Sequence, residues 1–201
     1  MTDVGVRVAR RGDVDAVTNT QIRAWRYGYD FLPEGPLEQM AGEGARGLWR
    51  RQWEEAIVAP PTPRHRLLVA VERGPDEARD DADGGDDNEG GAAGPWRERV
   101  VGLASHAPAE DPDLDPAKYA ELLTLLVDPD HVRRGHGSRL LNATVDHLRE
   151  DGFAAVVTWV FADHLPMLAF LESAGWAADE AERVLDMGRP IRMIRLATDI
   201  S

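Results

Sequence analysis

Two almost continuous apolar segments, one on each side of a glycine-containing loop, constrain the fold of this chain more than any other feature. The first, Glu121–Val127, reads ELLTLLV, and the second, Ala154–Phe161, reads AAVVTWVF. Segments of this length without polar alternation are typical of strands buried on both faces, in the middle of a sheet covered by helices. Between them, residues from about Ser138 to Glu150 predict a helix that ends at Gly152.

The rest of the chain supplies further elements in an order that favours one mixed sheet. Strands are predicted at Val4–Ala9, Arg66–Glu72, Arg99–Ala107, Arg183–Met187 and Ile191–Ala197. A first helix is expected after Asp13 as its N-cap, and a second helical region carries Trp49, Trp53 and Ile57 on one face. A short helix is expected over His164–Ser173. The order β-α-α-β-β-β-α-β-α-β-β predicts a single domain over residues 1–201, with helices on both faces of the sheet.

One segment departs from this pattern. Residues 74–95 read GPDEARDDADGGDDNEGGAAGP and hold eight acidic residues, one arginine and six glycines, with no large apolar residue. Such a composition disfavours packing into a core. The segment is therefore expected to be a disordered acidic insertion at a hairpin tip, where long insertions cost little free energy. The alternative is that it attracts a cationic substrate.

Charge and cysteine usage limit the function classes. The net charge is −13, of which the insertion carries −7 (eight acidic residues and one arginine), and this argues against nucleic acid as a partner. The chain has no cysteine, which excludes disulfides and thiolate nucleophiles and favours a reducing compartment. The longest apolar run, Ala154–Ala162, is far shorter than the roughly 20 residues that span a bilayer, and no signal peptide is evident. A soluble cytoplasmic protein is expected.

The loop Val132–Leu141, VRRGHGSRLL, has the properties of an anion site. The first backbone N–H groups of the following helix have no partner within it, and the helix dipole adds positive charge there. Gly135 and Gly137 remove side chains that would hold a ligand away. Arg133 and Arg134 add formal charge, and Ser138 can cap the helix or donate to an oxygen. These residues together predict a site for a pyrophosphate, although two glycines this close also fit an ordinary tight turn.

Two familiar phosphate loops do not fit the same residues. A Walker loop requires lysine and then serine or threonine after its last glycine, and here Ser138 and Arg139 follow. A dinucleotide fingerprint requires a third glycine at position 140, which is leucine. A different kind of phosphate ligand is therefore expected.

The segment Leu125–Leu141, LLVDPDHVRRGHGSRLL, resembles motif A of the GNAT superfamily of N-acetyltransferases. The usual form is Val-x-Pro, a short gap, and Arg/Gln-x-x-Gly-x-Gly/Ala at the start of a helix. Val127 and Pro129 match the first part, and the two glycines match the second. Val132 stands in the first Arg/Gln position, which is a departure. In this family the loop acts mainly through backbone amides.

The resemblance covers nearly the whole chain except the acidic insertion. The segment Ala24–Leu37, AWRYGYDFLPEGPL, is similar to the family's first helix and following turn, and Pro166–Trp176, PMLAFLESAGW, resembles motif B. It implies an α+β fold of three layers (α/β/α), with a mixed, mostly antiparallel central sheet flanked by helices and splayed at its central strands.

The resemblance also implies a reaction and a co-substrate. It indicates transfer of an acetyl group from acetyl-CoA to a primary amine of a small molecule or peptide, by direct attack on the thioester and without a metal. The exposed backbone of the strand before the loop would pair with the pantetheine arm. The residues implied to contact the coenzyme are Leu125, Leu126, Val127, Val132, Arg133, Arg134, Gly135, His136, Gly137, Ser138 and His164.

Glu121 is the candidate general base. An unperturbed lysine-like amine has a pKa near 10.4, so it must lose a proton before attack. Glu121 begins the central strand, at a place that resembles the position of a glutamate base in several family members. Burial at the edge of an apolar strand would raise its pKa. The alternative is a solvated strand end.

The general acid is not assigned. Alignment with motif B puts Leu171 in the position where many relatives carry a tyrosine that protonates the leaving thiolate. Water can replace it, since a thiol pKa near 8.5 makes a tolerable leaving group. Tyr119, Tyr27, Tyr29 and His164 are the alternative acids, and the sequence does not choose among them.

Three aromatic residues are candidates for the acceptor site. Trp25, Tyr27 and Tyr29 lie where the family's first helix and turn form a wall of the acceptor pocket, although core packing for Trp25 and surface positions for the tyrosines are alternatives. His131 and His136 share one loop but lack nearby carboxylates in a helical register, and no metal site is predicted.

Two other functions remain as alternatives. The first is a non-catalytic acyl-CoA-binding sensor, which the leucine at position 171 keeps open. The second is a generic α/β nucleotide binder, for which ATP would compete as well as coenzyme A. A homodimer is also left open.

Overall fold

The structure is a computed structural model that describes residues 3–75 and 96–201. The acidic insertion expected at 74–95 lies outside the described residues, except that Gly74 and Pro75 extend a strand. The two strands that flank the insertion are antiparallel neighbours, with Pro75 opposite Trp96 in their register.

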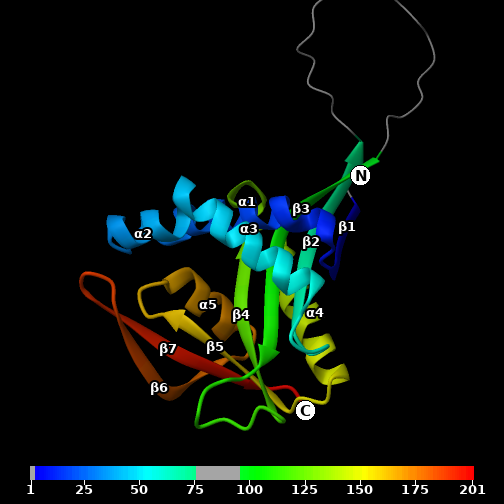
Figure 1. The fold of residues 1–201 in the computed structure, drawn as a ribbon. Helices are drawn as coiled ribbons and strands as arrows, with labels where there is room; N and C mark the ends of the chain where they lie inside the picture. Colours follow the sequence, from blue (N-terminus) through cyan, green and yellow to red (C-terminus); the bar gives the residue numbers. More distant parts are fainter. Residues whose placement is uncertain (1–2, 76–95) are drawn as a thin grey trace, which may run out of the picture.

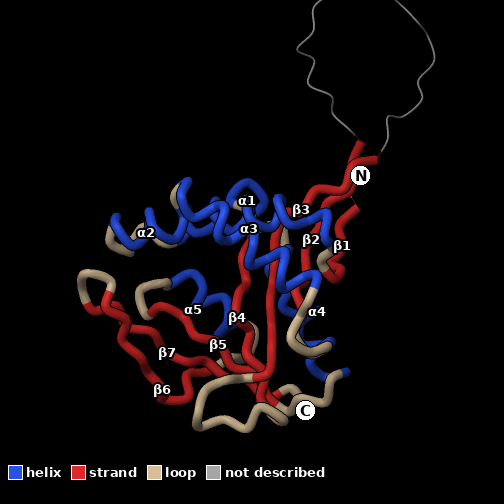
Figure 2. Tube along the Cα trace, viewed as in Figure 1, coloured by secondary structure: helices blue, strands red, loops and turns tan. Residues whose placement is uncertain are grey.

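Seven strands form one sheet in the order β1-β2-β3-β4-β5-β7-β6 (Figures 1 and 2). Every neighbouring pair is antiparallel except β4 and β5, which are parallel. This confirms the expected mixed, mostly antiparallel sheet. The strands are β1 Asp3–Val8, β2 Arg66–Pro75, β3 Trp96–Pro108, β4 Tyr119–Val127, β5 Ala155–Phe161, β6 Ala177–Asp186 and β7 Pro190–Asp199.

Helices cover both faces of the sheet. They are α1 Val14–Gly28, α2 Glu34–Ala41, α3 Glu43–Val58, α4 His136–Glu150 and α5 Leu165–Ser173, with short 3₁₀ turns η1 Arg11–Asp13 and η2 Pro129–His131. Alternate residues of β2 show the two layers: Leu67 and Val69 pack with Val17 of α1, whereas Leu68 packs with Leu140 and Leu148 of α4. The helices α1 and α3 therefore lie on one face and α4 on the other (Figure 1).

The expectations for the N-terminal helices need two corrections. The single helical region expected after the first helix is two helices, because the backbone of Gly42 is extended (φ −75°, ψ 172°) and interrupts the helix. A residue with a Cβ would not fit this position, since that atom would lie 2.3 Å from the Glu38 carbonyl oxygen. Asp13 does not cap α1 with its side chain. Its carboxylate instead accepts from the backbone N–H of Arg10 at 2.7 Å and from Arg7. Burial would raise the pKa of Asp13, but these bonds outweigh it and the pKa is lowered.

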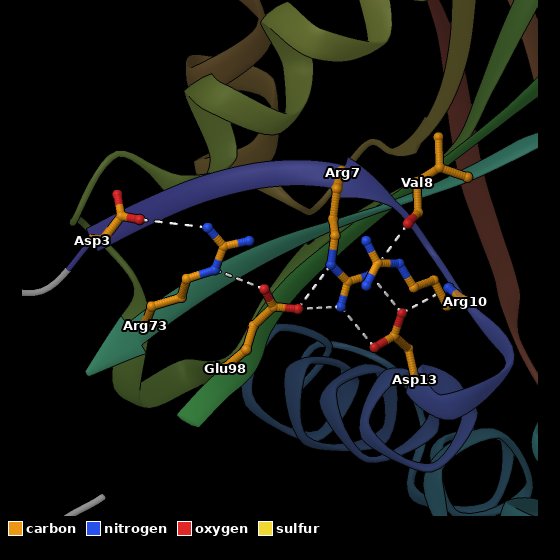
Figure 3. Close-up of polar contacts among 7 residues, drawn as sticks. All are labelled: Asp3, Arg7, Val8, Arg10, Asp13, Arg73 and Glu98. Carbon is orange, nitrogen blue, oxygen red and sulfur yellow. Dashed lines mark hydrogen bonds and ion pairs between the residues drawn. The ribbon is translucent and has the colours of Figure 1, made fainter. Parts of the chain in front are cut away.

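An ion-pair network links the first three strands of the sheet (Figure 3). Arg7 of β1 donates to both carboxylate oxygens of Asp13, at 2.7 and 2.9 Å, and its Nε donates to Glu98 of β3 at 2.8 Å. Arg73 of β2 also donates to Glu98, at 2.8 Å, and lies 3.5 Å from Asp3. The hydrogen bond from Arg7 lowers the pKa of Glu98. These charges link β1, β2, β3 and η1 next to the place where the insertion leaves the sheet.

The central strands β4 and β5 separate after three paired positions. Their register ends with Glu121 opposite Val157, and Thr158 then donates through Oγ1 to the Leu122 carbonyl at 2.8 Å. On its other edge β4 stays paired with β3 as far as Val127. Figure 1 shows β4 and β5 fanning apart. The expectation that Glu121–Val127 is buried on both faces is wrong at Leu123, which is 55% exposed, because the neighbouring strand is missing there and the β3 register shifts opposite it.

Candidate active site

A cavity of about 200 Å³ lies where β4 and β5 separate. Residues of both strands line it, together with side chains from α1, α2, α5 and β6. Among the lining residues are Trp25, Tyr29, Glu121, Leu125, Leu126, Phe161, His164, Met167, Leu171 and Arg183. Six residues named from the sequence therefore meet at this cavity: Trp25, Tyr29, Glu121, Leu125, Leu126 and His164. Tyr27 is 64% exposed and is not among the lining residues.

The edge of β4 that faces the cavity has unpaired backbone donors. The N–H of Asp128 donates to Val101 of β3 at 2.9 Å. Because N–H groups of successive strand residues point to opposite edges, the N–H of Leu126 also faces β3, whereas those of Leu125 and Val127 face the separated side. An extended ligand can therefore pair with Leu125 and Val127 as a further strand would.

The glycine loop leads from this edge to α4. Gly135 is left-handed (φ 82°), and Arg133 also has a positive φ of 62°. The first backbone bond of α4 runs from Arg139 N–H to the Gly135 carbonyl at 3.1 Å. The N–H groups of His136, Gly137 and Ser138 therefore have no partner within the helix. Together with the helix dipole they form a site for anionic oxygens, and the exposed Arg133 adds positive charge beside it.

The two glycines have different structural requirements. A Cβ at Gly135 would stand 2.9 Å from Nη1 of Arg139, and its φ favours glycine in any case. A Cβ at Gly137 would make only ordinary contacts, 3.7 Å to Phe170 and 3.8 Å to Val127. Of these two positions, therefore, only position 135 requires glycine for the loop to take its conformation. Val132 is half-buried, and Ser138 lies in the first turn of α4, not at its N-cap.

The side chain of His136 points away from the anion site, so the expected contact of this residue with the coenzyme can involve only its backbone. It is 1% exposed, and its Nε2 donates to Glu72 of β2 at 2.9 Å. His131 is also buried, and its Nε2 lies 3.6 Å from the other Glu72 oxygen. Only the backbone of His136 is available to a ligand. Glu72, which the sequence analysis did not select, holds the first residue of α4 and η2 against the sheet.

Glu121 lies at the point where the two strands part. Burial raises the pKa of its carboxyl group, and the negative charge of Asp111 raises it further, against the opposing charge of Arg183. Asp111 accepts from Trp159 Nε1 at 2.9 Å and from Arg195 at 3.2 Å. A half-buried carboxyl group with a raised pKa, at the wall of a cavity, is suited to accept a proton near neutral pH.

Tyr29 and His164 both line this cavity, and their rings meet edge to face with centroids 5.4 Å apart. Burial raises the pKa of Tyr29 to about 12, so its hydroxyl stays protonated in the neutral range. Burial lowers the pKa of His164, whose Nδ1 accepts from the Met167 N–H at 3.2 Å and caps α5. The remaining ring proton is then on Nε2. Of the alternative acids named from the sequence, these two line the cavity. Leu171 lines it as well and is 1% exposed.

Among residues 3–75 and 96–201, no group of three or more acidic or histidine side chains is arranged to hold a metal ion. Within the same ranges, no helix has both the length and the apolar character needed to cross a bilayer.

Comparison with known proteins yields a family and a set of similar folds. Residues 45–176 match the model of the acetyltransferase (GNAT) family. Human N-acetyltransferase 8 is 30% identical over 79 residues, which are 39% of this chain and 34% of that protein, so the match spans about a third of that relative.

Three solved structures illustrate the shared fold. PaiA N-acetyltransferase from Thermoplasma acidophilum, in complex with coenzyme A, superposes with a TM-score of 0.67 at 13% identity, covering 98% of this chain and 99% of that one. YncA from Salmonella typhimurium, with acetyl-CoA, gives 0.60 at 16% identity, with 99% and 95% covered. The ribosomal-protein-S18-alanine N-acetyltransferase from Escherichia coli gives 0.60 at 17% identity, again with 99% and 95% covered.

Proposed function

Because the chain belongs to the acetyltransferase (GNAT) family, we propose that it transfers the acetyl group of acetyl-CoA to a primary amine of a small molecule or peptide. The observation that carries this proposal is the meeting of three features in one place. These features are an open backbone edge of β4, a glycine loop with free N–H groups and a half-buried carboxyl group, and each of them borders or adjoins the cavity between β4 and β5.

The described residues fit the coenzyme. The N–H groups of His136, Gly137 and Ser138 bind its diphosphate, aided by Arg133 and the α4 dipole. The N–H groups of Leu125 and Val127 pair with the pantetheine arm, and the donor nearer the thioester stabilises the oxyanion that forms during attack. Acetyl-CoA supplies the acetyl group as a thioester, whose carbonyl carbon forms a bond to the amine nitrogen while the C–S bond breaks.

Glu121 takes the proton that the amine nitrogen loses, directly or through one water molecule. Its raised pKa brings its proton affinity closer to that of the acceptor than an ordinary glutamate would have. Trp25 and Tyr29 form the wall that the amine passes, because both line the cavity from α1 and the turn after it.

The leaving thiolate takes a proton from solvent, with Tyr29 and His164 as hydrogen-bond donors. A phenol with a pKa of about 12 is a weaker acid than a thiol, so Tyr29 stabilises the sulfur by donating a bond and does not transfer its proton completely. This arrangement substitutes for the tyrosine that Leu171 replaces.

The leucine at position 171 also favours a second candidate function, a non-catalytic acyl-CoA-binding sensor. Its side chain is buried in the cavity wall and carries no proton donor. The two candidate functions share the coenzyme site, but only the acetyltransferase would turn over acetyl-CoA.

The test is release of free thiol from acetyl-CoA across a panel of primary amines, with mass spectrometry of the acetylated product. The proposal predicts amine-dependent release that Glu121→Gln lowers while coenzyme affinity is kept. Tight coenzyme binding without release on any amine would favour the sensor. Competition by ATP as strong as that by coenzyme A would contradict both.

A further inference from the structure

A second, larger cavity of about 490 Å³ lies between α1, α3 and the face of β2, β3 and β4. Three tryptophans line it, namely Trp25, Trp49 and Trp53, and the rings of Trp25 and Trp49 meet edge to face with centroids 5.0 Å apart. The floor includes Leu67 and Ser105, both buried, and Ala56 of α3 lies at the exposed rim. A cleft walled by indole rings is suited to aromatic or branched apolar groups.

The cavity wall carries a buried amide with an unused donor. Gln21 is 1% exposed, and its Oε1 accepts from Trp53 Nε1 at 2.7 Å. Because an indole N–H can only donate, this bond fixes which end of the amide faces Trp53. Among the described residues, Gln21 Nε2 has no hydrogen-bond partner. A buried N–H without an acceptor is costly. This N–H is enclosed by protein atoms, so a ligand oxygen reaches it only when the cavity wall shifts, and it then gains a hydrogen bond that the protein alone does not supply.

The second cavity adjoins the candidate active site. Trp25, Leu123 and Thr124 line both cavities. Thr124 lies three residues beyond Glu121 on β4, which is about 10 Å along a strand. Leu123, between them, is 55% exposed and lines both cavities, so an apolar side chain lies where the two cavities adjoin.

The charges around the second cavity do not favour a cationic arm inside it. Arg66 is paired with Asp151, whose Oδ1 accepts from Nη2 at 2.9 Å. The ring of His106 stacks on His147 of α4, on the other face of the sheet, and burial lowers its pKa to about 4, so it is neutral at pH 7. Glu55 lies at the exposed rim. The buried part of the lining therefore offers indole faces, one amide donor and the hydroxyl group of Ser105.

We propose that this cavity binds the side arm of the acceptor, and that the acceptor is an amine with an aromatic or branched apolar group bearing an oxygen acceptor, about 7 to 10 Å from the reactive nitrogen. The proposal rests on the proposed acetyl transfer and narrows its substrate class. The amine lies beside Glu121, the apolar group lies among the three tryptophans, and the oxygen accepts from Gln21.

The test compares kcat/KM for butylamine, 4-phenylbutylamine, 4-(4-methoxyphenyl)butylamine and spermidine, all with acetyl-CoA. Both aryl amines are expected to exceed butylamine by about 10- to 100-fold, from burial of the ring. The methoxy compound is expected to exceed the phenyl compound by about 3- to 10-fold, from its bond to the amide. Spermidine is expected to resemble butylamine.

Two variants locate the effect. Ala56→Phe fills the cavity from its rim and is expected to remove the preference for aryl amines while kcat/KM for butylamine is unchanged. Leu48→Phe is the matched control, because Leu48 is on an exposed part of α3 outside the cavity lining. Gln21→Leu is expected to abolish only the methoxy advantage. Equal values for all four amines, or an aryl preference that Ala56→Phe leaves intact, would overturn this proposal alone. Absence of thiol release with every amine would overturn the proposed function and this proposal with it.

Discussion

Replacing Gly135 with alanine tests whether the left-handed residue before α4 sets the coenzyme site. Gly135 has φ 82° and ψ 6°, a conformation that costs a residue with a Cβ about 1–2 kcal/mol. The new methyl group would also stand 2.9 Å from Nη1 of Arg139, which donates to the Arg134 carbonyl at 3.0 Å. That guanidinium is on an exposed side chain and can move, so the backbone conformation dominates the cost.

This cost can appear in either of two measurements. If the variant keeps the left-handed conformation, its free energy of unfolding falls by about 1–2 kcal/mol and coenzyme affinity is unchanged. If the loop relaxes, stability is spared, the N–H groups at the start of α4 move, and coenzyme A binds about 5- to 30-fold more weakly. The two losses should therefore add to about 1–2 kcal/mol.

Gly137→Ala is the matched control, because its methyl group would meet Phe170 and Val127 only at ordinary contact distances. Alanine is favoured over glycine inside a helix, so this variant should be more stable by about 0.5–1 kcal/mol and keep its coenzyme affinity. Urea denaturation gives the stabilities and calorimetry with coenzyme A gives the affinities. A Gly135→Ala protein that matches the wild type in both, or two variants that behave alike, would refute the reasoning.

Three further predictions concern carboxyl groups. Glu121→Gln should lower kcat by about 10²- to 10⁴-fold and remove the acidic limb of the pH–rate profile, which the raised pKa places above the ordinary glutamate range. Glu110→Gln is the control: it should keep this limb and move it to slightly lower pH, because the charge of Glu110 raises the pKa of Glu121. An unchanged kcat in Glu121→Gln would exclude Glu121 as the base. Glu72→Ala should raise KM for acetyl-CoA about tenfold with little change in kcat, because Glu72 holds the first residue of α4 in place. Glu72→Gln should restore the wild-type KM. Tighter coenzyme binding in both variants would show that the negative charge of Glu72 matters more than its positioning of α4. Because the folded pKa of Asp13 is lowered, its contribution to stability is complete above its unfolded value of about 3.9 and is lost as the pH falls through the folded value. Asp13→Asn should thus lower the free energy of unfolding by about 1–3 kcal/mol at pH 7 and flatten its decline in acid, and equal acid slopes in urea titrations would contradict this.

The elements around the glycine loop could be predicted because local signals agree there. The apolar runs of β4 and β5 and the helix between them are continuous in sequence, and the ends found at Val127 and Glu150 agree with those expected. Glycine itself is an ambiguous signal. Nothing in the sequence distinguishes Gly42 from Gly44 as a helix end, but only Gly42 is extended and splits the helical region, whereas Gly44 lies inside α3.

The parts of the site that could not be predicted depend on contacts distant in sequence. Glu72 meets His136 across 64 residues, and neither a strand-end glutamate nor a loop histidine indicates the other. Asp111 affects Glu121 only because both lie beside β5, where Glu121 is opposite Val157 and Asp111 accepts from Trp159. The exposure of Leu123 arises from the separation of β4 and β5. This separation is a property of the assembled sheet, so the apolar sequence of β4 alone does not predict it.

The central claim is that backbone N–H groups of α4 and β4 hold coenzyme A between β4 and β5. Titration of ¹⁵N-labelled protein with coenzyme A, followed by amide NMR, measures this directly. The account predicts that the amide signals of His136, Gly137 and Ser138, and those of Leu125 and Val127, shift most and saturate with a common Kd. Saturable binding that leaves these five signals in place while others move would contradict it.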